Sequence, residues 1–112
     1  MPRRKKDKGM IQGIDQKQKI LIAFVLAGMD SISNKQVDIA LYLVNHAKGN
    51  YYVGDYKTIA KGSGTTFPTV KSILHRFTEL GLIIEKRVPT VGRALGMWDI
   101  EPLLTGMMEE NL

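Results

Sequence analysis

The sequence predicts an α+β domain in which several helices precede a C-terminal β-hairpin. A well-delimited helix covers about residues 66–80, and a shorter helix and a glycine turn come directly before it. Two apolar strands joined by a glycine-containing loop follow it. The chain has 112 residues and no internal repeat, which suits one domain with a modest core.

The N-terminal part is interpreted as an arm followed by an apolar segment. Residues 1–13 are basic and lack hydrophobic periodicity, so we expect a disordered arm ahead of a domain over residues 14–101. Asp15 is a suitable N-cap for the next segment, and Gly28 can end it. The apolar residues of 15–28 are continuous and fit a buried helix or a buried strand; helix is favoured.

The most apolar stretch, ILIAFVLAGM (20–29), does not predict a membrane segment. Its ten residues are about half of what a helix needs to cross a bilayer. It also lacks the small-residue cleavage motif of a signal peptide. We therefore expect a cytoplasmic protein without a membrane partner.

A second helix is marked by its cap and its apolar stripe. Ser33 or Asn34 can cap it, and it extends to about Ala47. Apolar side chains recur at helical spacing along it, at Val37, Ala40, Leu41 and Val44.

A turn, a short strand and a short helix come next. The turn is Lys48-Gly49-Asn50, and Tyr51-Tyr52-Val53 has the composition of a strand, which Gly54 breaks. Asp55 can then cap a helix from Tyr56 to about Gly62.

The helix over 66–80 has the clearest boundaries of the chain. Thr66 can cap it, Pro68 fits its first turn, and Gly81 ends it. Four apolar side chains recur at i, i+3, i+4 and i+7 and make its buried face, namely Val70, Ile73, Leu74 and Phe77.

The C-terminal part predicts a hairpin and a tail. Its strands are Leu82 to Val88 and Met97 to Ile100, joined by the loop PTVGRALG. Pro102 ends the second strand, and residues 102–112 form a short tail that is one turn of helix or frayed.

This order of elements resembles the winged helix-turn-helix family over roughly residues 35–100. In the family pattern a small residue, a turn glycine and a branched aliphatic residue recur at fixed spacing, and Ala60, Gly64 and Val70 match them. "TFPTV" looks like the start of a bacterial recognition helix, and "ELGLI" looks like the exit into the wing. The resemblance implies a three-helix core, an N-terminal helical segment, a C-terminal β-hairpin wing and binding to double-stranded DNA.

The distribution of charge supports a polyanionic partner. Residues 1–8 carry a net charge of +4 and residues 57–93 carry +5, whereas the rest of the chain sums to −4. Positive charge therefore gathers in the arm and in the segment of the helix-turn-helix and hairpin, as a DNA-binding surface requires.

The outer face of the helix over 66–80 provides the main candidate DNA contacts. Its N-terminus favours phosphate through free N–H groups and the helix dipole. Side chains farther along can reach base edges in a major groove, and Arg76 either a phosphate or a base. Phe67 either contacts thymine methyls or tucks under the preceding helix, and Glu79 either lies beyond the groove or pairs with His75 or Arg76. The candidates are Thr66, Phe67, Thr69, Lys71, Ser72, His75 and Arg76.

The hairpin and the arm supply further candidates. A wing arginine enters a minor groove or contacts phosphate, and a flexible basic arm adds affinity that does not depend on sequence. In both places a solvated charge without a DNA contact is the alternative. The candidates are Lys86, Arg87 and Arg93 in the hairpin and Arg3, Arg4, Lys5 and Lys6 in the arm.

Other chemistries lack their residues. The chain has no cysteine, its two histidines have no partners at metal-ligand spacing, and no serine, histidine and acid constellation is present. We therefore expect neither an enzyme nor a protein with a metal or cofactor.

Three functions fit the sequence. The first is a transcriptional regulator of a bacterium or mobile element, binding as a homodimer through the N-terminal apolar segment. The alternative is an accessory protein of plasmid replication or of a conjugation origin, because NYYVGDYKTIAKGSGTTFPTVKSILHRFTELGLI is similar to the winged module of plasmid replication proteins from Gram-positive bacteria. The third is a winged helix that binds proteins.

Overall fold

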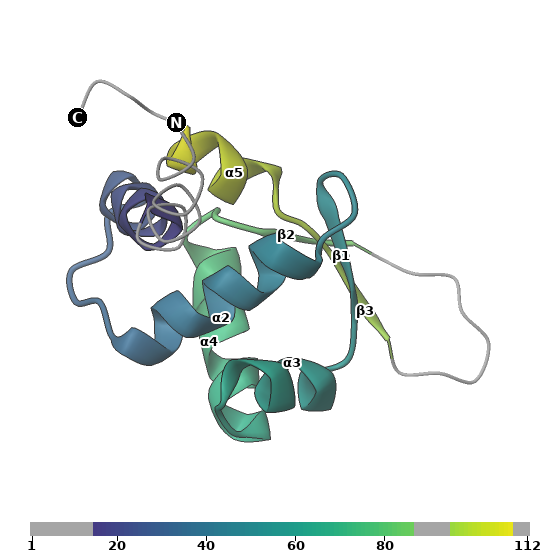
Figure 1. The fold of residues 1–112 in the computed structure, drawn as a ribbon. Coiled ribbons are helices and arrows are strands. Elements are labelled where there is room, and N and C mark those ends of the chain that lie inside the picture. Colours follow the sequence, from purple (N-terminus) through teal and green to yellow (C-terminus); the bar gives the residue numbers. More distant parts are fainter. Residues whose placement is uncertain (1–14, 87–94, 109–112) are drawn as a thin grey trace, which may run out of the picture.

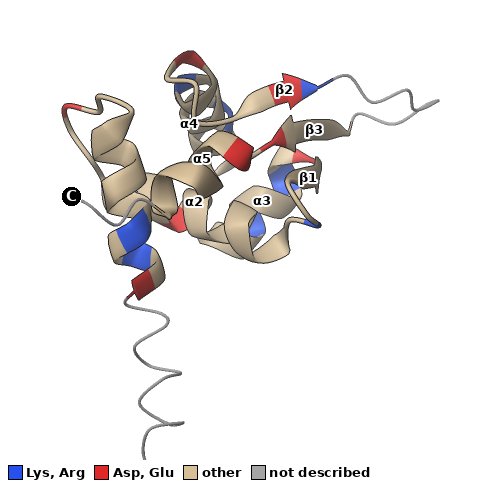
Figure 2. Cartoon of the chain, turned by 90° about the horizontal axis from the view of Figure 1, so that it is seen from above, with Lys and Arg blue, Asp and Glu red and all other residues tan. Residues whose placement is uncertain are grey.

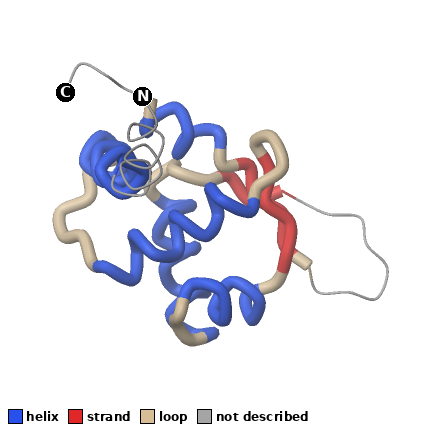
Figure 3. Tube along the Cα trace, in the orientation of Figure 1, coloured by secondary structure: helices blue, strands red, loops and turns tan. Residues whose placement is uncertain are grey.

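The computed structural model describes residues 15–86 and 95–108 and confirms the α+β winged-helix architecture (Figure 1). Described helices and strands follow one another along the chain as a helix over 15–26, α2 (Asn34–His46), β1 (Tyr51–Gly54), α3 (Tyr56–Ser63), α4 (Phe67–Glu79), β2 (Ile84–Lys86), β3 (Gly96–Asp99) and α5 (Glu101–Met107). Figure 3 shows the helices gathered on one side and the small sheet on the other. None of the helices within the described ranges is long and apolar enough to span a membrane.

The apolar segment near the N-terminus is a helix, as favoured from the sequence. It ends in a glycine cap: Gly28 has φ +86°, and its N–H donates to the Val25 carbonyl at 3.0 Å. Met29 N–H donates to the Phe24 carbonyl at 3.1 Å and completes the C-terminal cap of this helix. One face of this helix is buried in the core through Ile20, Ala23 and Phe24.

The opposite face of the same helix remains in solvent. Leu21, Val25 and Leu26 are 38%, 59% and 48% exposed, and we call these three side chains the outer apolar face. The continuous apolar run thus divides between a core face and a solvent face, which explains why its periodicity was uninformative.

Helix α2 begins at the expected cap and lies at the centre of the helical layer (Figure 1). Ser33 and Gln36 form a capping box, in which each side chain accepts a hydrogen bond from the other residue's backbone N–H, at 3.3 and 2.8 Å. The buried residues differ in part from the expected stripe, because neighbours cover α2 on more than one side. Val37, Ile39, Ala40 and Leu43 are buried, while Leu41 and Val44 pack at the edge of the core.

The sheet has three antiparallel strands in the order β1-β3-β2. The hairpin β2–β3 was expected, and β1 adds a third strand on the other side of β3. Trp98 is in register with both Tyr52 on β1 and Glu85 on β2. Gly54 does not break β1 as expected, since it is the last strand residue and pairs with Gly96.

The segment after the sheet is more ordered than the single turn or frayed end expected from the sequence. Helix α5 contains Pro102 in its first turn and buries Leu103 and Met107. It lies close to the N-terminal helix: a Cβ atom added at Gly106 would be only 2.8 Å from the Ala23 Cβ. Figure 1 shows the two helices together at the upper left of the molecule.

Candidate nucleic-acid interface

The corner between α3 and α4 has the geometry of a helix-turn-helix. Ala60 is buried, and its carbonyl accepts a hydrogen bond of 2.9 Å from Thr65 N–H across the turn. Gly64, with φ +73°, occupies the left-handed position that the turn requires. Val70 is fully buried six residues later, so the three positions that carried the resemblance have the expected structural roles.

Local signals fix where α4 begins. Thr66 caps it by accepting the backbone N–H of Thr69 at 3.4 Å, and its hydroxyl donates to the Thr69 hydroxyl at 2.8 Å. Phe67 packs edge-on against Tyr56 of α3, with ring centroids 5.5 Å apart, yet stays 42% exposed. The aromatic ring thus leans on the preceding helix, one of the two arrangements expected for it, and keeps an exposed edge.

Helix α4 separates a buried face from an exposed one. Val70, Leu74 and Phe77 are buried, and Phe77 contacts Phe24 with ring centroids 5.3 Å apart. The opposite face is exposed and carries most of the candidate contacts, namely Thr66, Phe67, Lys71, Ser72, His75 and Arg76, with Thr69 half-buried. The structure therefore brings these candidates together on one helix, and their contact with DNA stays a prediction.

Glu79 neutralises part of the positive charge at the end of this face. Its carboxylate lies 3.5 Å from Nε2 of His75 and 3.8 Å from a guanidinium nitrogen of Arg76. The sequence allowed a pairing with either residue, and the structure contains both. All three side chains are at least half exposed, so each pairing is weak and can give way to a phosphate.

Of the candidate DNA contacts in the hairpin and the arm, the structure describes one. Lys86 is exposed at the end of β2. Figure 2 shows lysine and arginine positions on α3, on α4 and at the end of β2. Arg87, Arg93, Arg3, Arg4, Lys5 and Lys6 lie outside the described residues.

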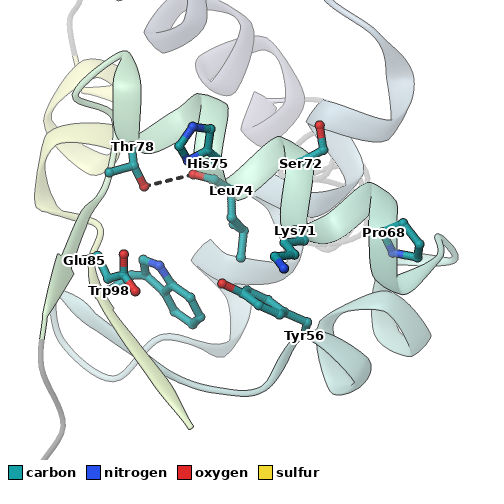
Figure 4. Close-up of a pocket in the computed structure, with 9 residues that line it drawn as sticks. All are labelled: Tyr56, Pro68, Lys71, Ser72, Leu74, His75, Thr78, Glu85 and Trp98. Atoms are coloured by element: carbon teal, nitrogen blue, oxygen red, sulfur yellow. Dashed lines mark hydrogen bonds between the residues drawn. The ribbon is translucent and has the colours of Figure 1, made fainter. Parts of the chain in front are cut away.

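Sequence reasoning missed a cavity of about 430 Å³ beside α4 (Figure 4). It opens between the exposed side of α4 and the sheet. No periodic pattern signals it, because its walls come from separate elements that meet only in the fold. The lining residues are Tyr56, Pro68, Lys71, Ser72, Leu74, His75, Thr78, Glu85 and Trp98.

Comparison with known families supports the resemblance drawn from the sequence. The sequence model of the Firmicute plasmid replication protein (RepL) family matches residues 10–93, which is 84 of the 112 residues. The matched region includes the helix-turn-helix and strand β2. No curated protein and no solved structure matches the chain significantly.

Proposed function

Because the chain belongs to the Firmicute plasmid replication protein (RepL) family, we propose that it acts in plasmid replication by binding double-stranded DNA, without catalysing a reaction itself. The family favours replication, the alternative function inferred from the sequence, over the transcriptional regulator that came first. The observation that carries the DNA-binding part is the exposed, cation-bearing face of α4 behind a well-formed helix-turn-helix corner.

In this proposal α4 enters the major groove with its N-terminal end first. Thr66 and Thr69 lie at this end, where backbone N–H groups and the helix dipole favour a phosphate. Lys71, Ser72 and His75 follow on the exposed side, at the positions from which side chains reach base edges. Arg76 reaches a phosphate or a base once it leaves Glu79.

The hairpin and the arm extend the interface. Lys86 ends β2, and the sequence between β2 and β3 contains Arg87 and Arg93, so the hairpin segment is basic. We expect it to contact the minor groove or the phosphates beside it, as a wing does. The basic residues 1–8 add contacts to phosphate that do not depend on base sequence. Specificity thus rests mainly on α4, and affinity is shared by all three regions.

The active form in this proposal is a homodimer. The outer apolar face places three large aliphatic side chains next to one another in solvent on the N-terminal helix. A symmetric contact between two copies of this helix would bury these side chains. A dimer with two-fold symmetry favours DNA sites made of two symmetric half-sites.

Selection of bound sequences from random duplexes tests the proposal. Wild-type protein should enrich one motif, and the same motif should occur repeatedly at the replication origin of the plasmid that encodes the chain. Enrichment of a site at the gene's own promoter alone would return the assignment to a regulator. Weak, salt-insensitive binding without an enriched motif would refute the DNA-binding role and favour the winged helix that binds proteins.

A further inference from the structure

The cavity beside α4 has the size of a small-molecule site. Its volume of about 430 Å³ lies within the range of ligand-binding clefts. A second hollow of about 220 Å³ shares Tyr56, Glu85 and Trp98 with it and continues past Gly54 and Gly96. The two hollows share these three lining residues and lie side by side, so we call them together the groove; it lies next to the helix that is proposed to bind DNA.

Two aromatic rings form the floor of this groove. The centroids of Tyr56 and Trp98 are 5.9 Å apart, and Figure 4 shows both rings on the side of the cavity opposite α4. Each ring also contacts another aromatic side chain: Tyr52 stacks on Trp98 with ring centroids 6.2 Å apart, and Phe67 packs edge-on against Tyr56. Trp98 is only 3% exposed and its ring is tilted by 40° from that of Tyr56. The half-buried Tyr56 ring is therefore the face on which a planar ligand such as a nucleobase can stack, and Trp98 lines the cavity beside it.

The polar groups of the cavity differ between its two sides. Lys71 and His75 project from α4, and Glu85 stands on the sheet side next to Trp98 (Figure 4). Among the described residues, no basic nitrogen lies within 4.0 Å of the Glu85 carboxylate. A carboxylate accepts hydrogen bonds from amino groups and repels phosphate. The sheet side therefore suits an amino-bearing ring, and the α4 side suits the phosphate attached to it.

Tyr56 adds a donor at the same place. Burial raises the pKa of its phenol, and the nearby Glu85 carboxylate raises the pKa further. The hydroxyl therefore keeps its proton at neutral pH and can donate to a ring nitrogen or carbonyl oxygen.

We propose that this cavity binds one unpaired nucleobase that carries an exocyclic amino group. The base stacks on Tyr56 beside Trp98, its amino group donates to Glu85, and its phosphate lies near Lys71. Thymine lacks the amino group and is disfavoured. The base belongs either to an unpaired nucleotide of bound DNA or to a free nucleotide; the DNA-borne form rests on the proposed function.

Trp98 is the only tryptophan of the chain, so its fluorescence reports directly on the cavity. We expect dCMP to quench it saturably, and dTMP to bind about fivefold more weakly because it lacks one charge-assisted hydrogen bond. Absence of saturable quenching by dCMP, or equal affinity for the two nucleotides, overturns the proposal.

Substitutions identify the groups responsible. Glu85→Gln introduces an amide that can also donate a hydrogen bond to the thymine carbonyl. The affinities of this variant for dCMP and dTMP should therefore become nearly equal. Glu101→Gln removes the same charge at the start of α5, outside the cavity, and should keep the wild-type preference. Tyr56→Leu should abolish quenching, with far-UV circular dichroism checking its fold. An unchanged preference in Glu85→Gln contradicts the assigned role of the carboxylate and the proposal with it.

Duplexes distinguish the two sources of the base. A duplex with one bulged cytosine should quench Trp98 at lower concentration than free dCMP if the base comes from DNA, and no better than a fully paired duplex if free nucleotides are the occupants. Gel shift with the fully paired duplex reports the proposed function separately. Loss of that shift refutes DNA binding, whereas a normal shift without any nucleotide-dependent quenching refutes only the cavity proposal.

Discussion

Nε2 of His75 lies 3.5 Å from Oε2 of Glu79, one turn farther along α4. The same carboxylate group lies 3.8 Å from Arg76, so one acid faces two of the side chains proposed to contact DNA. If α4 contacts DNA as proposed, Glu79 opposes binding in two ways, through its own negative charge and by holding two of the contact side chains.

Glu79→Gln should therefore strengthen DNA binding. The variant frees His75 and Arg76 and removes one repulsive charge, and the gain should be about 0.2–1 kcal/mol on any duplex, as for exposed ion pairs. Fluorescence anisotropy at low salt measures it, with Glu101→Gln on α5 as the matched loss of charge. Equal affinity of the Glu79 and Glu101 variants would place the end of α4 away from the duplex.

Lys71→Ala and His75→Ala test whether α4 reads sequence. Each should cost about 1–3 kcal/mol on the selected motif if the side chain contacts a base edge, and less on random DNA. Competition titrations with the two kinds of duplex measure the difference. The same loss on both duplexes would identify phosphate contacts, and no loss on either would remove α4 from the groove.

The arm and the wing should differ in their dependence on salt. Deleting residues 1–8 removes up to five basic residues and should flatten the slope of affinity against salt on all sequences. Arg93→Ala should lower that slope by about one and weaken sites with A·T-rich flanks selectively. An unchanged slope after the deletion would identify the arm as a solvated tail. Equal behaviour of Arg93→Ala and wild type on every flank would exclude a minor-groove contact.

Val25→Glu tests the homodimer. Val25 is the most exposed member of the outer apolar face, and burying a carboxylate there would disfavour association. Sedimentation equilibrium at tens of micromolar should show a dimer for wild type and a monomer for the variant. Asn34→Glu, which adds an acid at the exposed start of α2, should remain a dimer. A monomeric wild type would refute the dimer directly.

Asp55 gives the fold a dependence on acid pH. Hydrogen bonds from the side chain and the backbone of Thr58 lower the pKa of its carboxyl group. Its contribution is thus present above the ordinary pKa of about 3.9 and is lost as the pH falls through the lower folded value. Asp55→Asn keeps a cap acceptor without this titration, so the difference in Tm between wild type and variant should shrink below about pH 4. A difference that stays constant with pH would contradict the assignment.

The parts of the fold that short-range signals determine were predictable from the sequence. The caps Ser33, Asp55 and Thr66 and the glycine ends at Gly28 and Gly81 act within one helical turn, and each is at the expected place. The exposed face of α4 was predictable from its 3.6-residue period, because its buried residues all lie on one face of the helix.

Features that depend on distant segments were not predictable. The pairing of β1 with β3 joins residues more than forty positions apart, and nothing in YYVG indicates its partner. Helix α5 is stable because Leu103 and Met107 enter a core that the rest of the chain builds. The cavity beside α4 needs Trp98 and Tyr56 at one place, and only the assembled sheet brings them there.

The close approach of Gly106 to Ala23 brings α5 directly against the N-terminal helix. A methyl group on Gly106 would lie 2.8 Å from the Ala23 Cβ, so any larger residue at this position would push the two helices apart. A second copy that docks on the outer apolar face would therefore contact a helix that is itself packed against α5. In the proposed dimer, a larger residue at position 106 would thus move the outer apolar face and change the spacing between the two α4 helices.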